Sequence, residues 1–200
     1  MRIIAGLYKG QTIQAVRGAS TRPTTDRVRE AWASTLCGLL PEGFEGVRVL
    51  DAFAGSGALG LEALSRGAKH VTFCERDPRA LRTLRANVGL FDPERCTTSV
   101  LALDVLSPKA VRPLKERGPY NLVILDPPYA YPAGRVQGLL HNLALTGSLA
   151  TAALVAYEHR AGESDGLDGC VLCPACSPAS LRMVSYKIYG TTQIDYLSYR

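Results

Sequence analysis

Residues 47–66 read VRVLDAFAGSGALGLEALSR, and this stretch decides the fold of the chain. Its first five residues, 47–51, are mostly apolar and predict a buried strand. The glycines that follow predict a tight turn, and residues 58–66 have the apolar spacing of a helix. A strand that leads through a glycine turn into a helix is the repeating unit of α/β folds.

The same alternation continues toward the C-terminus. Further strands are predicted at residues 71–74, 99–103, 120–125 and 152–157, and further helices at residues 78–90, 108–116 and 134–143. Because crossovers between parallel strands are right-handed, this order predicts a Rossmann-like, doubly wound, mostly parallel sheet. Two final strands about a tight turn predict an antiparallel C-terminal hairpin at the edge of that sheet, at residues 181–189 and 191–199.

The flanking regions have weaker patterns. Residues 1–16 alternate roughly between apolar and polar and predict a β-hairpin. Residues 26–40 predict a helix that ends at Pro41-Glu42-Gly43, and residues 160–180 predict an irregular loop. We therefore expect two parts: a basic hairpin and helix extension at residues 1–42, and a catalytic domain at residues 43–200.

Basic residues gather at the N-terminus. The chain has 200 residues, with 23 Lys and Arg against 18 Asp and Glu. Residues 1–35 hold six basic and two acidic residues, which accounts for +4 of the net charge of +5. A basic extension suits a polyanion partner, although a merely solvated basic surface explains the charge equally well. The six basic residues are Arg2, Lys9, Arg17, Arg22, Arg27 and Arg29.

We expect neither a signal peptide nor a membrane span from the sequence. Only a few apolar residues separate Arg2 from Lys9, so no signal peptide is evident. The longest stretch free of charged side chains, residues 136–157, contains several polar residues and does not predict a membrane span. Six cysteines without an export signal indicate reduced thiols. We expect a soluble cytoplasmic protein with no membrane partner.

Three acids close successive strands around the glycine turn. Gly55 and Gly57 let the backbone approach a ligand, and the next helix offers its free amides. This glycine pattern also matches a dinucleotide-binding turn, or a turn without a ligand. Asp51 would repel a pyrophosphate but suits the cationic end of S-adenosylmethionine. Glu75 could hold the ribose hydroxyls of either ligand, and Asp104 could accept a hydrogen bond from the adenine amino group or be a solvated loop acid.

The stretch NLVILDPPY, residues 121–129, carries the predicted chemistry. Asp126 follows a buried strand, at the end where α/β sheets place their ligands. The carboxylate of Asp126 and the carbonyl of Pro127 can accept both hydrogens of a planar amine and aim its lone pair outward. Tyr129 can stack on a nucleobase flipped into the pocket. This arrangement predicts methyl transfer to an exocyclic amine, helped by alignment and by the carboxylate charge.

Other chemistries fit less well. A cytosine C5 methyltransferase needs a thiol near the strand at 120–125, and no cysteine lies there. Cys170, Cys173 and Cys176 resemble a metal knuckle without its fourth ligand, which His159 could supply. We favour free thiols and expect no metal site.

Several stretches resemble the RsmD family of bacterial methyltransferases, which modify the 2-amino group of a guanine in 16S ribosomal RNA of the small subunit. They are MRIIAG at residues 1–6, RPTTDRVREA at 22–31, LDAFAGSGALGLEALSRGA at 50–68 and LDPPY at 125–129. The resemblance implies a class I methyltransferase fold with Asp126, Pro127 and Tyr129 at the target base. It also implies that S-adenosylmethionine is held by Asp51, Phe53, Gly55, Gly57, Glu75 and Asp104.

The resemblance also implies an RNA partner. Arg22, Thr24 and Arg27 would lie near the active site. Phosphate contacts, which position RNA without reading its sequence, would come from Arg2, Lys9, Arg17, Arg22 and Arg27. The substrate would be ribosomal RNA, in a small-subunit particle, with no obligate protein partner. The cysteine-bearing segment departs from the family pattern.

The sequence leaves other functions open. Methyltransferases with a related corner act on amino groups of adenine in DNA or RNA, or on a protein glutamine. A nicotinamide-dependent oxidoreductase could use the same glycine turn, and a non-catalytic RNA-binding or assembly factor would need only the basic extension.

Overall fold

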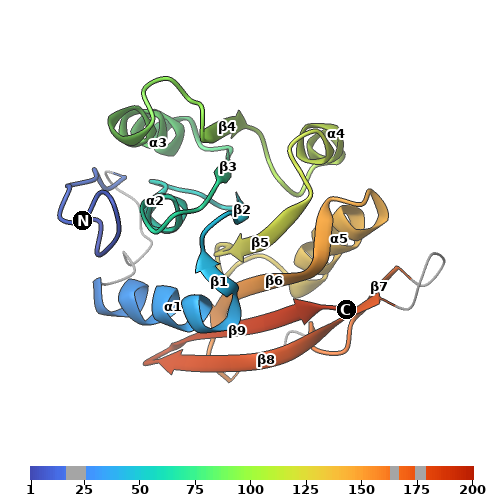
Figure 1. Ribbon diagram of the computed structural model, residues 1–200. Helices are drawn as coiled ribbons and strands as arrows, with labels where there is room; N and C mark the ends of the chain where they lie inside the picture. The colour runs from blue at the N-terminus through green and yellow to red at the C-terminus, as the bar shows by residue number, and fades with distance from the viewer. Residues whose placement is uncertain (17–25, 163–166, 174–178) are drawn as a thin grey trace. The chain divides into compact units, whose positions relative to one another are not determined.

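The computed structural model describes residues 1–16, 26–162, 167–173 and 179–200 (Figure 1). The described chain forms two compact units, Met1–Ala102 and Leu103–Arg200. This division differs from the predicted boundary near residue 42, which stays a prediction. Each unit contains strands and helices of its own, and each is described by itself.

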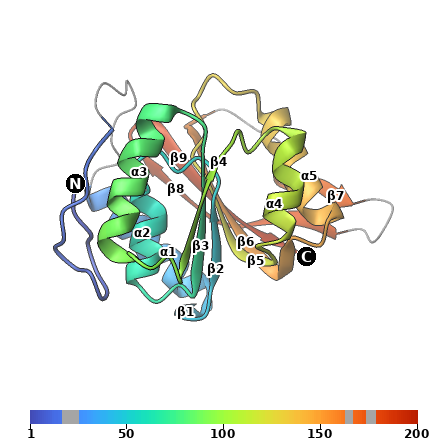
Figure 2. The ribbon, with the colours of Figure 1, turned by 90° about the horizontal axis from the view of Figure 1, so that it is seen from above.

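The first unit is built on three parallel strands in the order β4-β3-β2. The strands are β2 (Arg48–Asp51), β3 (His70–Glu75) and β4 (Thr98–Ala102). Helices α2 (Ala58–Ser65) and α3 (Pro78–Phe91) lie side by side along these strands (Figure 2). Helix α3 begins where Asp77 accepts hydrogen bonds from the amides of Arg79 and Ala80, with Pro78 in its first turn.

The N-terminal segment is anchored to helix α2 by a buried carboxylate. Glu62 is fully buried and accepts hydrogen bonds from the amides of Ile4 (2.8 Å) and Ala5 (3.2 Å) and from Nε of Arg66 (2.8 Å). The predicted hairpin is reduced to one antiparallel bridge, between Arg2 and Thr12. Backbone groups that lack a strand partner here are therefore satisfied partly by a helix side chain.

Helix α1 (Asp26–Leu39) confirms the helix predicted at residues 26–40. Strand β1 (Pro41–Phe44) follows it at the position where the sequence predicted only a helix end. Phe44 is buried and its ring lies 6.1 Å from that of Trp32 on α1, between ring centroids. Proline and glycine in β1 suggest a turn when read locally, and burial of Phe44 favours the extended form.

The second unit starts with a short 3₁₀ turn (Pro108–Ala110) that continues into α4 (Val111–Lys115). Strand β5 (Tyr120–Leu125) has the predicted bounds and pairs in parallel with β6 (Leu149–Arg160). Helix α5 (Ala133–Leu145) connects them, and α4 and α5 lie on one side of these strands (Figure 2). Residues 122–125 are all fully buried, as expected of a strand in a parallel sheet.

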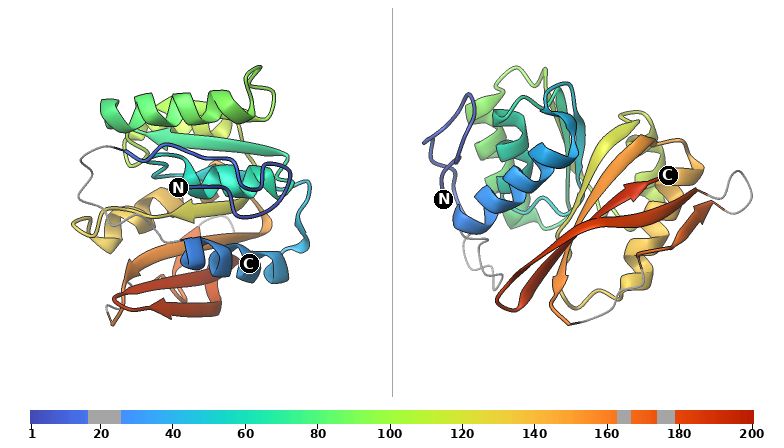
Figure 3. Two further views of the ribbon diagram at one scale, coloured as in Figure 1. Left: turned by 90° about the vertical axis from the view of Figure 1, so that its left-hand side faces the viewer. Right: turned by 60° about the horizontal axis from the view of Figure 1, so that its bottom comes forward.

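The C-terminal strands are antiparallel. Strand β9 (Thr192–Tyr199) lies between β6 and β8 (Ala179–Tyr189), and β7 (Val171–Cys173) pairs with β8 at the edge. The predicted hairpin is confirmed as the long β8–β9 ribbon seen in Figure 3. Strand β7 lies inside the segment predicted as an irregular loop. The chain thus has the predicted Rossmann-like α/β fold with a C-terminal antiparallel hairpin.

Candidate active site

The glycine turn joins β2 to α2 within the first unit. Gly55 and Gly57 both have positive φ angles, 54° and 84°. A Cβ atom on Gly57 would lie 2.6 Å from Cδ1 of Leu84, so a side chain there would displace Leu84 and would also strain the backbone. At Gly55, by contrast, nothing lies within 4 Å of the position a Cβ would take. Gly55 therefore leaves open space in which a ligand can approach the backbone.

Two predicted carboxylates hold the shape of this turn. Glu75 accepts hydrogen bonds from the amide of Gly55 at Oε2 (2.9 Å) and from the amide of Asp77 at Oε1 (2.7 Å). Asp51 is buried and its Oδ2 accepts from the amide of Gly60 (3.1 Å). Each oxygen of Glu75 keeps a lone pair, so the carboxylate is oriented and can still accept from two ligand hydroxyls. The turn and Glu75 fit the ribose end of S-adenosylmethionine.

Asn87 is a buried residue of this region that the sequence analysis missed. Its Oδ1 accepts from the amide of Gln14 (2.9 Å), and its Nδ2 donates to the carbonyls of Gln14 (2.9 Å) and Ser56 (2.8 Å). One side chain on α3 thus ties the N-terminal segment to the glycine turn. An asparagine in the middle of an amphipathic helix gave no signal, because its partners are more than thirty residues away in sequence.

Asp104 and Phe53 complete the predicted donor-binding set. Phe53 is half-buried and follows β2 in the first unit. Asp104 belongs to the second unit, is half-buried, and accepts a hydrogen bond from the amide of Leu106 at Oδ1 (3.0 Å). The first unit therefore brings together Asp51, Phe53, Gly55, Gly57 and Glu75. Contacts of any of them with a ligand stay predictions.

The DPPY corner follows β5 in the second unit. Asp126 is half-buried, and no hydrogen bond to its carboxylate forms within the described part of the chain. Burial raises its pKa to about 6. The carbonyl of Pro128 accepts from the amide of Tyr131 (2.9 Å) and so closes the turn. The result is a rigid corner with a carboxylate whose lone pairs are available to an amine.

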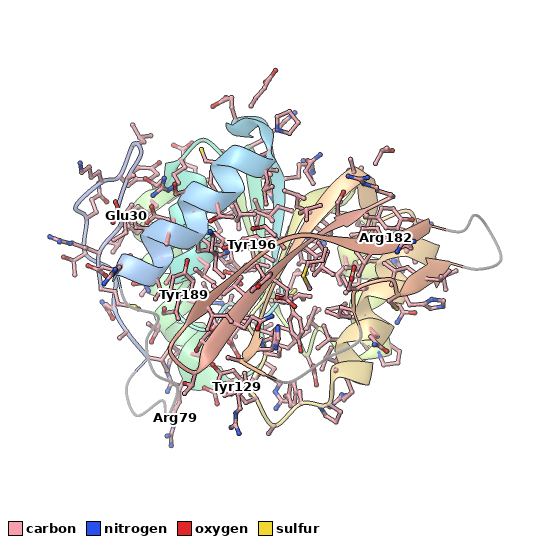
Figure 4. All side chains as sticks on the ribbon, turned by 90° about the horizontal axis from the view of Figure 1, so that it is seen from below. Glu30, Arg79, Tyr129, Arg182, Tyr189 and Tyr196 are labelled. Carbon is pink, nitrogen blue, oxygen red and sulfur yellow. The ribbon has the colours of Figure 1, made fainter. Side chains whose placement is uncertain are left out.

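The orientation of Tyr129 is fixed by residues of strands β6 and β9. Its hydroxyl lies 3.0 Å from Oγ1 of Thr192, and the guanidinium of Arg160 lies 5.6 Å from its ring centroid. Half of the residue is exposed (50%). Figure 4 shows Tyr129 near the β8–β9 turn, with Arg182 toward the other end of the ribbon. An exposed ring in a fixed orientation can stack on a base.

Glu158 is a second carboxyl group beside this corner that the sequence analysis missed. It follows Tyr157 on β6 and is half-buried. Burial and, to a smaller extent, the nearby charge of Asp126 raise the pKa of Glu158 to about 8. The sequence analysis selected acids that directly follow a predicted strand. Glu158 meets the same criterion, because it follows the strand predicted at residues 152–157. That signal was present in the sequence.

The predicted phosphate contacts are only partly described. Arg2, Lys9 and Arg27 are exposed, and Nε of Arg2 lies 3.3 Å from Oδ2 of Asp26. Arg29, by contrast, is fully buried, and its Nη2 donates to Asp26 and to the carbonyl of Arg2. Part of the basic excess is therefore interior. Arg17, Arg22 and Thr24 lie outside the described residues.

The predicted alternative of a metal knuckle would use His159 as its fourth ligand. Both ring nitrogens of His159 are engaged, Nε2 with Oδ2 of Asp195 (3.0 Å) and Nδ1 with the carbonyl of Arg160 (3.0 Å). Both nitrogens thus have partners within the protein, which disfavours His159 as a metal ligand, and the metal knuckle itself stays untested. No group of metal-binding side chains occurs among the described residues, and the side chains of Cys173 and Cys176 lie outside that description. The described residues also hold no helix with the length and apolar character needed to cross a membrane.

Comparison with known proteins identifies the family. A family model described as conserved hypothetical protein 95, the RsmD family, matches residues 1–197. The chain belongs to the RsmD family. The resemblance seen in the sequence is thus confirmed over nearly the full chain.

Individual relatives agree with this membership in the RsmD family. The chain is 36% identical over 159 residues to "Ribosomal RNA small subunit methyltransferase D" of Escherichia coli K12, covering 79% of this chain and 74% of that one. It is 40% identical over 129 residues to YlbH of Bacillus subtilis, described as a candidate rRNA methyltransferase, covering 64% and 67%. Among solved structures, Escherichia coli yhhF, described as a candidate methyltransferase, matches with a TM-score of 0.74 and 30% identity. That match covers 100% of this chain and 98% of yhhF.

Proposed function

We propose that this chain transfers a methyl group from S-adenosylmethionine to the exocyclic 2-amino group of a guanine in 16S ribosomal RNA of the small subunit. The observation that carries the proposal is Asp126, a half-buried carboxylate without a hydrogen-bond partner among the described residues, at the end of β5 in a DPPY corner. Membership in the RsmD family and the ribosomal RNA methyltransferase named among its relatives support the choice of substrate.

The corner suits an aromatic amine because such a nitrogen is a weak nucleophile whose lone pair is delocalised into the ring. Asp126 and the Pro127 carbonyl accept its two hydrogens and aim the lone pair away from the protein. S-adenosylmethionine supplies a methyl group on a positively charged sulfur. The nitrogen lone pair forms the new N–C bond, the electron pair of the broken C–S bond stays on sulfur, and the extra proton on nitrogen leaves to Asp126 and then to water. Asp126 also stabilises the positive charge that develops on nitrogen.

The donor and the acceptor are assigned to different groups of residues. The open space at Gly55 and the oriented carboxylate of Glu75 serve the donor. Tyr129 offers a stacking surface for the guanine, and exposed Arg2, Lys9 and Arg27 suit RNA phosphates. This division explains why one chain carries both a glycine turn and a basic extension.

Mass spectrometry of nucleosides tests the proposal. The purified protein is incubated with labelled S-adenosylmethionine and, separately, with small ribosomal subunits, naked 16S RNA and genomic DNA. We expect labelled N2-methylguanosine from ribosomal RNA, and the arm that reacts faster shows whether a particle or free RNA is the substrate. Labelled N6-methyladenine from DNA would contradict the proposal. Tight binding of NAD in calorimetry, without binding of S-adenosylmethionine, would favour an oxidoreductase instead.

A further inference from the structure

Two carboxyl groups lie on neighbouring strands in the second unit: Asp126 directly follows β5, and Glu158 lies in β6 two residues before that strand ends. Strands β5 and β6 are parallel, and their paired residues include Ile124 with Ala156 and Leu125 with Tyr157. The next residues along the two strands are Asp126 and Glu158. Paired residues of adjacent strands point to the same face of a sheet and lie about 5 Å apart. Continuing this register by one residue places Asp126 beside Glu158, and the charge of Asp126 accordingly acts on the Glu158 carboxyl.

Neither carboxyl group is neutralised by a basic partner. Within the described residues no hydrogen bond or ion pair forms to the carboxyl group of Asp126 or of Glu158, and both residues are half-buried. Two carboxylates this close repel each other in a site with little solvent. Burial and the charge of Asp126 raise the pKa of Glu158 to about 8, and burial alone raises the pKa of Asp126 to about 6. Near neutral pH the pair therefore carries one proton, on Glu158.

The other charged groups around Glu158 lie on β6 and β9, and each has a partner of its own. On β6 itself, His159 attracts the Glu158 charge and partly offsets the rise of its pKa. The ring nitrogens of His159 lie beside Asp195 on β9 and the carbonyl of Arg160. The residue paired with Glu158 on β9 is the apolar Ile194. Arg160 lies over the ring of Tyr129. The net negative charge at this strand end thus belongs to Asp126 and Glu158.

We propose that Glu158 is a positioning residue for methyl transfer: in its protonated form it donates a hydrogen bond to Asp126 and holds that carboxylate in line with the target amine. This inference rests on the proposed function. A protonated carboxyl beside a carboxylate makes a short, strong hydrogen bond, which fixes the rotamer of Asp126. Loss of the proton from Glu158 removes the donor and adds a second charge, so Asp126 turns away. Glu158 then sets the alkaline limit of the reaction and Asp126 sets the acid limit.

The pH profile of turnover tests this role in Glu158→Gln. In the wild type we expect kcat to fall below about pH 6, where Asp126 becomes protonated, and above about pH 8, where Glu158 ionises. The glutamine amide can still donate to Asp126 but cannot ionise, so the alkaline fall should disappear while the acid fall remains. Glu158→Ala, which has no donor, should lower kcat at least tenfold at pH 7. Glu116→Gln, a change in an exposed carboxylate on the same unit, is the matched control and should keep the wild-type profile.

Outcomes of this experiment separate the two proposals. The dependence of kcat on pH is measured from about pH 5.5 to about pH 9.5, a range that includes both pKa values. If the curve of Glu158→Gln is parallel to that of the wild type over this range, the positioning role is wrong. If the wild type methylates no RNA at any pH, the proposed function fails.

Thermal unfolding tests the shared proton without any assay of activity. Because the folded state raises the pKa of Glu158, its stabilising effect is complete at low pH and is lost as pH rises through about 8. Glu158→Gln should therefore melt within about a degree or two of the wild type near pH 4.5, and increasingly above it, by several degrees, as pH rises to about 8 and beyond. An equal difference in Tm at both pH values would contradict the shared proton, even if the methyl transfer proposal holds.

Discussion

Asp126→Asn lowers the rate of methyl transfer by about 10³-fold in single turnover, while the affinity for S-adenosylmethionine stays within about twofold of the wild type. The reason is that an amide of the same shape loses the negative charge that stabilises the developing cation. Its NH₂ group also presents a donor to an amine that needs acceptors. Half-burial of Asp126 makes the loss larger than at a solvated position, because water cannot replace the charge.

The matched control for this variant is Asp168→Asn. Asp168 is an exposed carboxylate in the same unit, where its Oδ1 accepts from the amide of Met183 (2.7 Å). This control should keep wild-type turnover. Single-turnover rates with small subunits in excess, together with calorimetry for S-adenosylmethionine, provide both measurements. If Asp126→Asn and Asp168→Asn turn over equally, Asp126 has no part in the mechanism.

Gly55→Ala weakens binding of S-adenosylmethionine by at least about tenfold, which corresponds to about 1.4 kcal/mol. A methyl group at this position enters the open space that the ligand would use. The substitution also costs stability, because Gly55 has a φ of 54°. A residue with a Cβ in this conformation is less stable by about 1–2 kcal/mol.

Gly46→Ala separates these two effects. Gly46 has a φ of 72° and likewise nothing within 4 Å of its missing Cβ, but it lies in an exposed turn between β1 and β2. The two variants should lose similar stability in urea denaturation, and only Gly55→Ala should lose affinity in calorimetry. Equal affinity of Gly55→Ala and the wild type would remove the glycine turn from the donor site.

The local sequence pattern was sufficient to predict a strand or helix where that element is determined by its own residues. The apolar run 122–125 followed by two prolines allows little other than a buried strand and a stiff corner, and β5 has the predicted bounds. Asp77 and Pro78 similarly set the start of α3. Strands β1 and β7 were missed because proline and glycine in β1, and the short length of β7, indicate turns until the neighbouring chain is known.

The site was less predictable than the fold because burial is not local. Arg29 looks like one more basic surface residue in the sequence, yet it is fully buried against Asp26 and the carbonyl of Arg2. The role of Asn87 depends on Gln14 and Ser56, which no periodicity connects to it. Glu158 could have been found from its place at a strand end, whereas its coupling to Asp126 required the parallel register of β5 and β6.

The most direct test is a structure of the protein bound to a small ribosomal subunit with S-adenosylhomocysteine, the demethylated product of the donor. The account predicts the 2-amino nitrogen of a flipped guanine about 3 Å from both the Asp126 carboxylate and the Pro127 carbonyl, at hydrogen-bonding distance. It also predicts that the bound product contacts Gly55 and Glu75 of the first unit. A bound guanine whose amine is held by other groups, with Asp126 directed away from it, would contradict the account.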